Sequence, residues 1–239
     1  MNKRFSTVIS LENKRGFVAV IPDIKRVSPK EGDLLRGRDP SEAARQLVRY
    51  GAPVLSVVTE RERFGGSPAL LRRIARSVDV PVLRKDFVTD EVMLEETAEL
   101  GASAILLICA ITDEKNLEKL FQKAIQLDIE PLVEVHTAEE MAFAGRLGAS
   151  LIGINNRNIV IFEKDNGGPE RTVMLASGAP AGSLLISESG IVSPDDVQTA
   201  ASAGVNAVLV GTALWQAEDL EKAYQSFRIE RKDTPCVQS

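Results

Sequence analysis

Lys85 stands at the end of a predicted buried strand, where a charged side chain could do acid–base chemistry. The apolar segment 80–83 stops abruptly at Arg84, Lys85, Asp86 and Phe87. Ligands of α/β proteins bind at the carboxyl ends of parallel strands, and an ammonium group that faces such a pocket can act as a general acid. Lysine side chains are usually solvated, so Lys85 is a convincing candidate for a site residue only if similar polar residues follow other strands.

Similar polar residues follow five more predicted strands. They are Asp23 and Lys25; Glu134 and His136; Asn155, Asn156 and Arg157; Glu188, Ser189 and Gly190; and Gly211 with Thr212. Glu134 lies between two valines, so its carboxylate faces one side of a covered sheet, where an unpaired charge is costly. His136 is the sole histidine and a weaker candidate, because a helix-capping loop begins there. Arg84 and Asp86 also have a weaker claim, because alternate strand residues point away from Lys85.

Glycines and hydroxyl groups follow the last two predicted strands. Segments 188–191 and 210–213 contain Ser189, Gly190, Gly211 and Thr212. Barrels of alternating strands and helices often bind phosphate after their seventh and eighth strands, where backbone N–H groups approach the oxygens closely. The two segments together predict a phosphate site. No Walker-type loop is present in the sequence, so a nucleoside triphosphate is not indicated.

Eight predicted strands position these residues, and a helical pattern follows each one. The strands cover 17–21, 54–58, 80–83, 104–108, 131–135, 151–154, 184–186 and 207–210; the helices cover 40–50, 68–78, 89–100, 113–127, 137–147, 173–177, a stretch opened by Ser193, and 214–227. Such units are typical of βα repeats. We predict a single (β/α)8 TIM barrel domain over residues 1–239, with a short N-terminal segment at 1–16 and a flexible tail at 228–239. A doubly wound open sheet is the alternative, but it usually has fewer strands.

The composition argues against several classes of protein. The chain has 239 residues, a formal net charge of −5 and two cysteines without partners at metal-ligand spacing. These features argue against a nucleic-acid partner, an anionic membrane surface, a disulfide framework and a zinc site. Reduced thiols and the lack of a signal-peptide pattern or a membrane span predict a cytoplasmic protein.

Seven segments, in order, resemble the indole-3-glycerol-phosphate synthase family of tryptophan biosynthesis. They are 23–29, 64–67, 83–87, 132–136, 152–158, 187–191 and 210–214. The resemblance implies a carboxy-lyase that closes the indole ring of 1-(2-carboxyphenylamino)-1-deoxyribulose 5-phosphate with loss of carbon dioxide and water. It implies a phosphorylated small-molecule substrate, no cofactor or metal, and partners among the enzymes of the same pathway.

The resemblance also implies a role for each matching residue. Lys85 resembles the general acid of ring closure, Glu134 the acid–base group of the dehydration, and Lys25 a lysine that contacts the substrate and its phosphate. Asn155 and Arg157 resemble the residues that hold the anthranilate end. The resemblance also implies catalytic roles for Asp23 and Glu188, an aromatic pocket formed by Phe64 and Phe87, and a substrate contact at Ser28. It implies a phosphate site formed by Ser189, Gly190, Gly211 and Thr212.

Two departures from the family pattern leave other functions open. Asp23 stands where the family usually has glutamate, and its carboxylate is retracted by about 1.5 Å on an unchanged backbone. Sixteen residues precede the first predicted strand, so we expect the helix that covers the substrate's aromatic end to be reduced or missing. One alternative is a paralogue that acts on a smaller phosphorylated sugar. The others are a non-catalytic phosphate-binding barrel and a sugar-phosphate isomerase.

Overall fold

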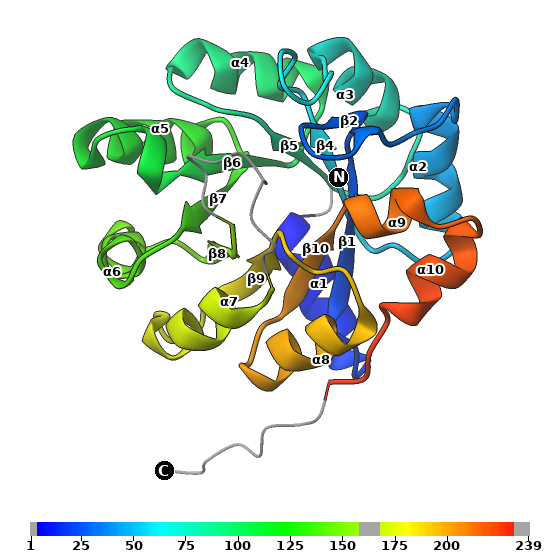
Figure 1. The fold of residues 1–239 in the computed structure, drawn as a ribbon. Coiled ribbons are helices and arrows are strands. Elements are labelled where there is room, and N and C mark those ends of the chain that lie inside the picture. Colours follow the sequence, from blue (N-terminus) through cyan, green and yellow to red (C-terminus); the bar gives the residue numbers. More distant parts are fainter. Residues whose placement is uncertain (1–3, 158–167, 232–239) are drawn as a thin grey trace.

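The computed structural model describes residues 4–157 and 168–231, and its centre is a closed barrel of eight parallel strands (Figure 1). The strands are β1 (Ala19–Ile24), β4 (Leu55–Val58), β5 (Val82–Lys85), β6 (Ala104–Ile108), β7 (Glu130–Val135), β8 (Leu151–Asn155), β9 (Leu184–Glu188) and β10 (Ala207–Val210). Pairing of β1 with both β10 and β4 closes the sheet. The predicted (β/α)8 barrel is therefore confirmed, and all eight strands lie within a few residues of their predicted positions.

Helices cover the outside of the barrel, and each predicted helix has a counterpart. They are α2 (Pro40–Arg49), α3 (Pro68–Ala75), α4 (Glu91–Leu100), α5 (Glu114–Gln126), α6 (Ala138–Leu147), α7 (Glu170–Leu175), α8 (Pro194–Ser202), α9 (Thr212–Gln216) and α10 (Leu220–Ser226). Short 3-10 turns follow β6 at η1 (Cys109–Ile111) and α7 at η3 (Ala176–Gly178). The prediction of one final helix over 214–227 is wrong, because the chain leaves the helical conformation at Ala217 and Asp219 caps a new helix.

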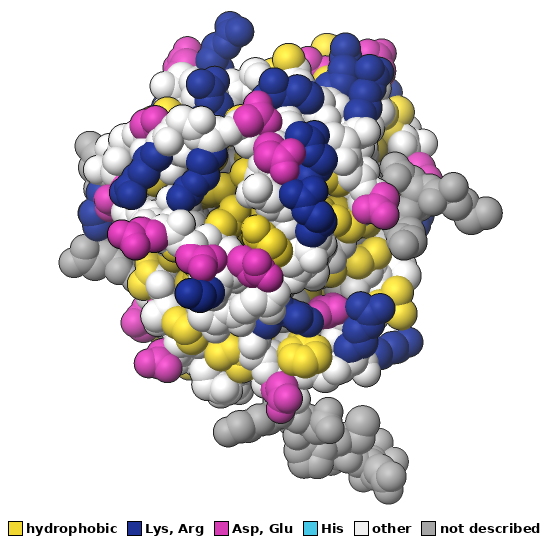
Figure 2. Space-filling view, turned by 90° about the vertical axis from the view of Figure 1, so that its right-hand side faces the viewer, with side chains coloured by type: hydrophobic (Ala, Val, Ile, Leu, Met, Phe, Trp, Pro, Cys, Tyr) yellow, Lys and Arg dark blue, Asp and Glu magenta, His cyan; other side chains and the backbone are white. Residues whose placement is uncertain are grey.

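Local signals in the sequence fix where several of these helices begin and end. Asp39 caps α2 by accepting hydrogen bonds from the backbone N–H groups of Ser41 and Glu42. At the other end of the βα units, a glycine with positive φ turns the chain into the next strand at positions 51, 101, 148 and 204. The outer face around α2 carries charged side chains of both signs with apolar ones between them (Figure 2).

Helix α1 (Phe5–Lys14) closes the amino end of the barrel and was missed by the sequence analysis. Phe5 and Ile9 are fully buried and pack against the inward-facing side chains of the strands, and α1 lies beside β1 (Figure 1). Ser6 donates hydrogen bonds to the Glu130 carboxylate through its hydroxyl and its backbone N–H. Residues 5–14 thus form the floor of the barrel and do not cover the mouth.

The segment after α10 continues along the outside of the floor. Ile229 accepts a hydrogen bond from the N–H of Val18, and Arg231 donates one to the carbonyl of Gly16. Arg228 pairs with Glu12 of α1. The first part of the predicted flexible tail, residues 228–231, is therefore held against the barrel, whereas residues 232–239 lie outside the described residues. Within the described ranges, no helix has the length and apolar character needed to cross a bilayer.

Candidate active site

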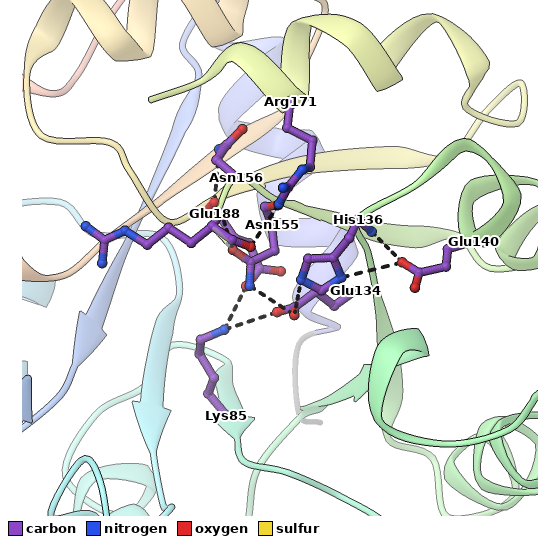
Figure 3. Close-up of polar contacts among 9 residues, drawn as sticks. Lys85, Glu134, His136, Glu140, Asn155, Asn156, Arg171 and Glu188 are labelled. Atoms are coloured by element: carbon purple, nitrogen blue, oxygen red, sulfur yellow. Dashed lines mark hydrogen bonds and ion pairs between the residues drawn. The ribbon is translucent and has the colours of Figure 1, made fainter. Parts of the chain in front are cut away.

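An ammonium group between two buried carboxylates occupies the centre of the barrel mouth (Figure 3). Lys85 ends β5, and its Nζ lies 2.9 Å from Glu188 Oε2 and 3.5 Å from Glu134 Oε2. The carboxylates come from β9 and β7, and both are almost completely shielded from solvent. The barrel therefore brings together three predicted residues that are far apart in the sequence.

Burial and mutual charge shift the proton affinities of this group. Burial favours neutral Lys85, but the charges of Glu188, Glu134 and Asp23 outweigh it and raise the pKa of the ammonium. Burial raises the pKa of Glu188 to about 7, against the opposing effect of Lys85. Lys85 therefore carries its proton at neutral pH, whereas Glu188 lies near the point at which it gains or loses one.

The carboxylate of Glu188 is fully buried, and one of its oxygens lacks a hydrogen bond from any described residue. No donor among the described residues reaches its Oε1, although the atom is buried. A Cβ at Gly153 on β8 would collide with the same oxygen, so only glycine leaves room for the carboxylate. A buried oxygen without a donor is costly, and such groups are often kept for function.

Asn155 is the last residue of β8 and Asn156 follows it, and their side chains have different partners. The side-chain amide of Asn155 donates to Glu134 Oε1 at 3.0 Å, so this residue belongs to the mouth. The Asn156 amide instead donates to Ser187 Oγ and to the Glu188 carbonyl, which ties β8 to β9. The adjacent position that ends the predicted motif 152–158, Asn158, lies outside the described residues.

Asp23 and Lys25 line the mouth from the end of β1. Ser56 on the neighbouring strand β4 donates a 2.7 Å hydrogen bond to Asp23 Oδ1, and both residues are buried. Lys25 is also buried, and its Nζ lies 5.4 Å from the centre of the Phe64 ring, at a distance typical of a cation–π contact. Ser56 could not be identified from the sequence, because nothing in its own strand marks it as a partner of Asp23.

Two phenylalanines form an aromatic wall beside Lys85. The ring centres of Phe64 and Phe87 are 6.5 Å apart. Glu60, which the sequence analysis did not select, shapes the loop before Phe64, because its carboxylate accepts the N–H groups of Glu62, Arg63 and Phe64. The cavity has about 610 Å³ of empty space, open solvent included, and its lining contains Asp23, Lys25, Phe64, Lys85, Phe87, Glu134, Asn155, Arg157 and Ser189.

A smaller recess adjoins this cavity at the ends of β9 and β10. Ser189, Gly190, Gly211 and Thr212 line it, and it shares Asp23, Lys25, Lys85, Arg157 and Ser189 with the larger cavity. Ser189 has a φ of 63°, an uncommon conformation for a residue with a side chain, and Gly190 follows with 71°. The four residues of the predicted phosphate site are therefore gathered around one recess.

Two predicted site residues line neither cavity. Glu188 is buried behind the wall and contacts Lys85, which lines both cavities. Ser28 belongs to the short strand β2 (Val27–Ser28), which pairs with β3 (Gly32–Asp33), and its Oγ accepts the N–H groups of Lys30 and Glu31. Ser28 therefore shapes the loop after β1 in this structure.

Arg84 on β5 faces the helix layer, in agreement with its weaker claim, whereas Asp86, which follows β5, also lines the larger cavity. The Arg84 guanidinium is buried and donates to Thr59 Oγ1, Thr97 Oγ1 and the Met93 carbonyl. Asp86 accepts the N–H of Phe87 at 2.9 Å. The two residues thus hold the segment that carries Lys85 and Phe87.

Comparison with known proteins gives a consistent result over nearly the whole chain. The family model described as indole-3-glycerol phosphate synthase matches residues 2–227. Relatives named indole-3-glycerol phosphate synthase include a Pyrococcus abyssi protein, 42% identical over 87% of this chain and 90% of its own length. One from Kineococcus radiotolerans is 45% identical over 86% of this chain and 74% of its own, and one from Listeria monocytogenes is 39% identical over 96% and 89%. The chain belongs to the indole-3-glycerol phosphate synthase family.

Proposed function

We propose that the protein converts 1-(2-carboxyphenylamino)-1-deoxyribulose 5-phosphate to indole-3-glycerol phosphate by ring closure, decarboxylation and dehydration. The observation that carries this proposal is the Lys85 ammonium, which lies between two buried carboxylates, beside an aromatic wall and a recess of glycines and hydroxyl groups. Membership of the family supports the same reaction and the same enzyme class, a carboxy-lyase. The alternatives raised by the sequence are not favoured by these matches.

Ring closure needs a proton for the substrate's ketone oxygen while the arene attacks its carbon. Lys85 keeps its proton at neutral pH and opens onto the cavity, so it can protonate that oxygen and offset the charge that develops there. A ketone held close to Nζ would take the place of one carboxylate contact. Loss of a contact with Glu188 or Glu134 lowers the pKa of the ammonium and makes it a stronger acid.

The anthranilate end of the substrate fits the side of the cavity that contains the phenylalanines. Phe64 and Phe87 offer apolar surface for its ring, whereas Arg157 supplies a guanidinium for its carboxylate. Loss of the carboxylate as carbon dioxide is easier once its charge leaves water for a partly apolar pocket. Asn155 positions Glu134 at the same side through its 3.0 Å hydrogen bond.

Dehydration of the closed ring needs an acid for the leaving hydroxyl and a base for the ring proton. Glu134 and Lys25 both line the cavity and can fill these roles, with Asp23 beside Lys25. Glu188, with a pKa of about 7, can hold a proton and return it to Lys85 after Lys85 has protonated the substrate.

The phosphate fits the recess after β9 and β10. The small residues Gly190 and Gly211 permit a close approach to the backbone, and the hydroxyl groups of Ser189 and Thr212 add donors. Lys25 and Arg157 line both cavities, so their positive charges can bind the phosphate dianion as well as orient the sugar chain.

Two further expectations rest on the sequence. The chain has two cysteines and no pattern typical of a disulfide framework, which supports a cytoplasmic location. Its membership of the family supports binding partners among the enzymes of tryptophan biosynthesis. Pull-down of the protein with each such enzyme, in the presence and absence of substrate, would test the second expectation.

Turnover of the carboxyphenylamino-deoxyribulose phosphate, followed by indole fluorescence, tests the proposed function. We expect the wild type to form product and Lys85→Met to lose about a thousandfold in kcat, because a general acid commonly contributes that much. The matched control is Lys123→Met, which removes an ion-paired lysine from the outer surface and should leave kcat unchanged. An inactive wild type that still binds inorganic phosphate would contradict the synthase function and favour the paralogue.

A further inference from the structure

The imidazole of His136 lies between two carboxylates at the edge of the active site (Figure 3). Its Nε2 is 3.5 Å from Glu134 Oε1, and its Nδ1 is 3.4 Å from Glu140 Oε2. The side chain is largely buried, with an exposed fraction of 10%. His136 therefore connects a residue of the cavity wall with α6, which contains Glu140.

The charge state of the imidazole decides whether this arrangement is favourable. A neutral imidazole has one N–H and one lone pair, so one of the two carboxylates would face a lone pair. The doubly protonated ring presents an N–H to each carboxylate. In the described residues neither ring nitrogen has a partner with hydrogen-bond geometry, although each lies within 3.5 Å of a carboxylate oxygen.

Glu140, the carboxylate on the α6 side of His136, is held in place by the backbone as well. Its carboxylate accepts the backbone N–H of His136 at 2.5 Å. Burial opposes its charged form, but the side chain and backbone N–H of His136 outweigh burial and lower the pKa of Glu140. The outer carboxylate is therefore ionised and fixed by its position in the first turn of α6.

Apart from Glu134 and Glu140, no other charged group near His136 among the described residues pairs with its imidazole. Cys109 of η1 lies near both carboxylates, and burial together with the charges of Glu140 and Glu134 raises the pKa of its thiol to about 12, which keeps it neutral. On the cavity side, Glu134 receives Asn155 from β8 and Lys85 from β5. The charged groups that lie against His136 are thus the carboxylates of Glu134 and Glu140.

We propose that His136 is a positioning residue that bridges Glu134 and Glu140 as a double donor and thereby fixes the orientation of the Glu134 carboxylate. This inference deepens the proposed function and rests on it. Without His136, Glu134 Oε1 keeps only the Asn155 donor, and the carboxylate can turn relative to Lys85 and the substrate. A displacement of about 1 Å at a reacting group can cost up to about a hundredfold in rate.

Three substitutions of His136 separate the two halves of the bridge. The amide nitrogen of Gln reaches the position of Nε2 and keeps a donor for Glu134, whereas that of Asn reaches the position of Nδ1 and keeps one for Glu140. We expect His136→Ala and His136→Asn to lower kcat by about tenfold with little change in KM, and His136→Gln to retain most of the activity. Equal kcat values for all three variants and the wild type, or equal losses in all three, would overturn the proposal.

Glu140→Gln tests the outer half of the bridge, with Glu139→Gln as the matched control from the same turn of α6. We expect Glu140→Gln to lower kcat and to add nothing to the loss in His136→Ala, because residues of one network are not additive. Glu139→Gln should leave kcat unchanged, since Glu139 is exposed. Full additivity of the Glu140 and His136 substitutions would contradict a shared bridge.

Nuclear magnetic resonance observes the bridge without any assay, because His136 is the only histidine of the chain. At the pH of the activity assay we expect an N–H at each ring nitrogen, with both protons shifted as hydrogen bonds to carboxylates shift them. A single ring N–H under those conditions would overturn the proposal. If the wild type proves inactive, the proposed function fails, and the ring nitrogens still decide whether the bridge exists.

Discussion

The two ends of the barrel are built on opposite principles. At the floor, Phe5 and Ile9 of α1 fill the barrel with apolar side chains, and the polar residues around them are paired. At the mouth, the buried carboxylates of Glu134 and Glu188 flank the partly buried Lys85, one carboxylate oxygen has no donor among the described residues, and Ser189 has a positive φ.

The floor therefore stabilises the folded protein, whereas the mouth destabilises it. Apolar burial at the floor stabilises the barrel, whereas the buried charges and strained backbone at the mouth oppose folding and are kept for chemistry. Substitutions at the floor should therefore change stability and leave kcat alone, and those at the mouth should change kcat.

Phe5→Ala should show the largest effect on stability. Removal of a fully buried phenylalanine leaves a cavity and should lower the free energy of unfolding by about 3–5 kcal/mol. Denaturant unfolding measures this loss, and kcat at a temperature where the variant is folded should match the wild type. A proportional fall in kcat would show that the floor and the mouth are coupled.

Gly153→Ala should act mainly on catalysis. The added methyl group collides with the Glu188 carboxylate and moves it away from Lys85, so we expect kcat to fall by about a hundredfold. Gly178→Ala is the matched control, because its methyl group would meet only the Met141 side chain at 3.9 Å. Unchanged kcat in Gly153→Ala would mean that the position of Glu188 is unimportant.

Asp23→Glu should produce a smaller gain. The longer side chain advances the carboxylate by about 1.5 Å into the mouth, toward the substrate. Steady-state kinetics should show a severalfold rise in kcat. A fall would indicate that the hydrogen bond from Ser56 has adapted this site to the shorter side chain.

The dependence of stability on pH should reveal Glu188 directly. Its pKa rises from an ordinary value of 4.5 to about 7 on folding, so the unfolded chain releases the proton at lower pH. The contribution of Glu188 to the free energy of unfolding is therefore highest below pH 4.5 and falls as pH increases through 7. Wild type should lose stability relative to Glu188→Gln over this interval in denaturant titrations. A constant difference would contradict the raised pKa.

The sequence was sufficient for the strands and for most of the mouth, and the reasons are physical. Each strand is a short apolar run buried on both faces, and of the polar residues at its end every second one, such as Lys85 after Arg84, faces the mouth. Helix α1 escaped detection because its buried face contains few apolar residues, among them Phe5 and Ile9, in an otherwise polar stretch.

Contacts between strands could not be predicted in the same way. Ser56 is recognisable only when it lies beside Asp23, and the need for glycine at position 153 only when Glu188 lies against it. His136 was a weak candidate in the sequence because its partner Glu140 becomes visible only after α6 is placed. Such residues depend on register and helix position, which local patterns do not specify.

The release of carbon dioxide and the formation of the indole, measured together in one reaction of the wild-type protein with the carboxyphenylamino-deoxyribulose phosphate, test the central claim most directly. If the mouth closes the ring and removes the carboxyl group, carbon dioxide and indole product should appear in equal amounts and at the same rate. Consumption of the substrate without carbon dioxide, or no consumption at all by protein that binds phosphate, would contradict this assignment.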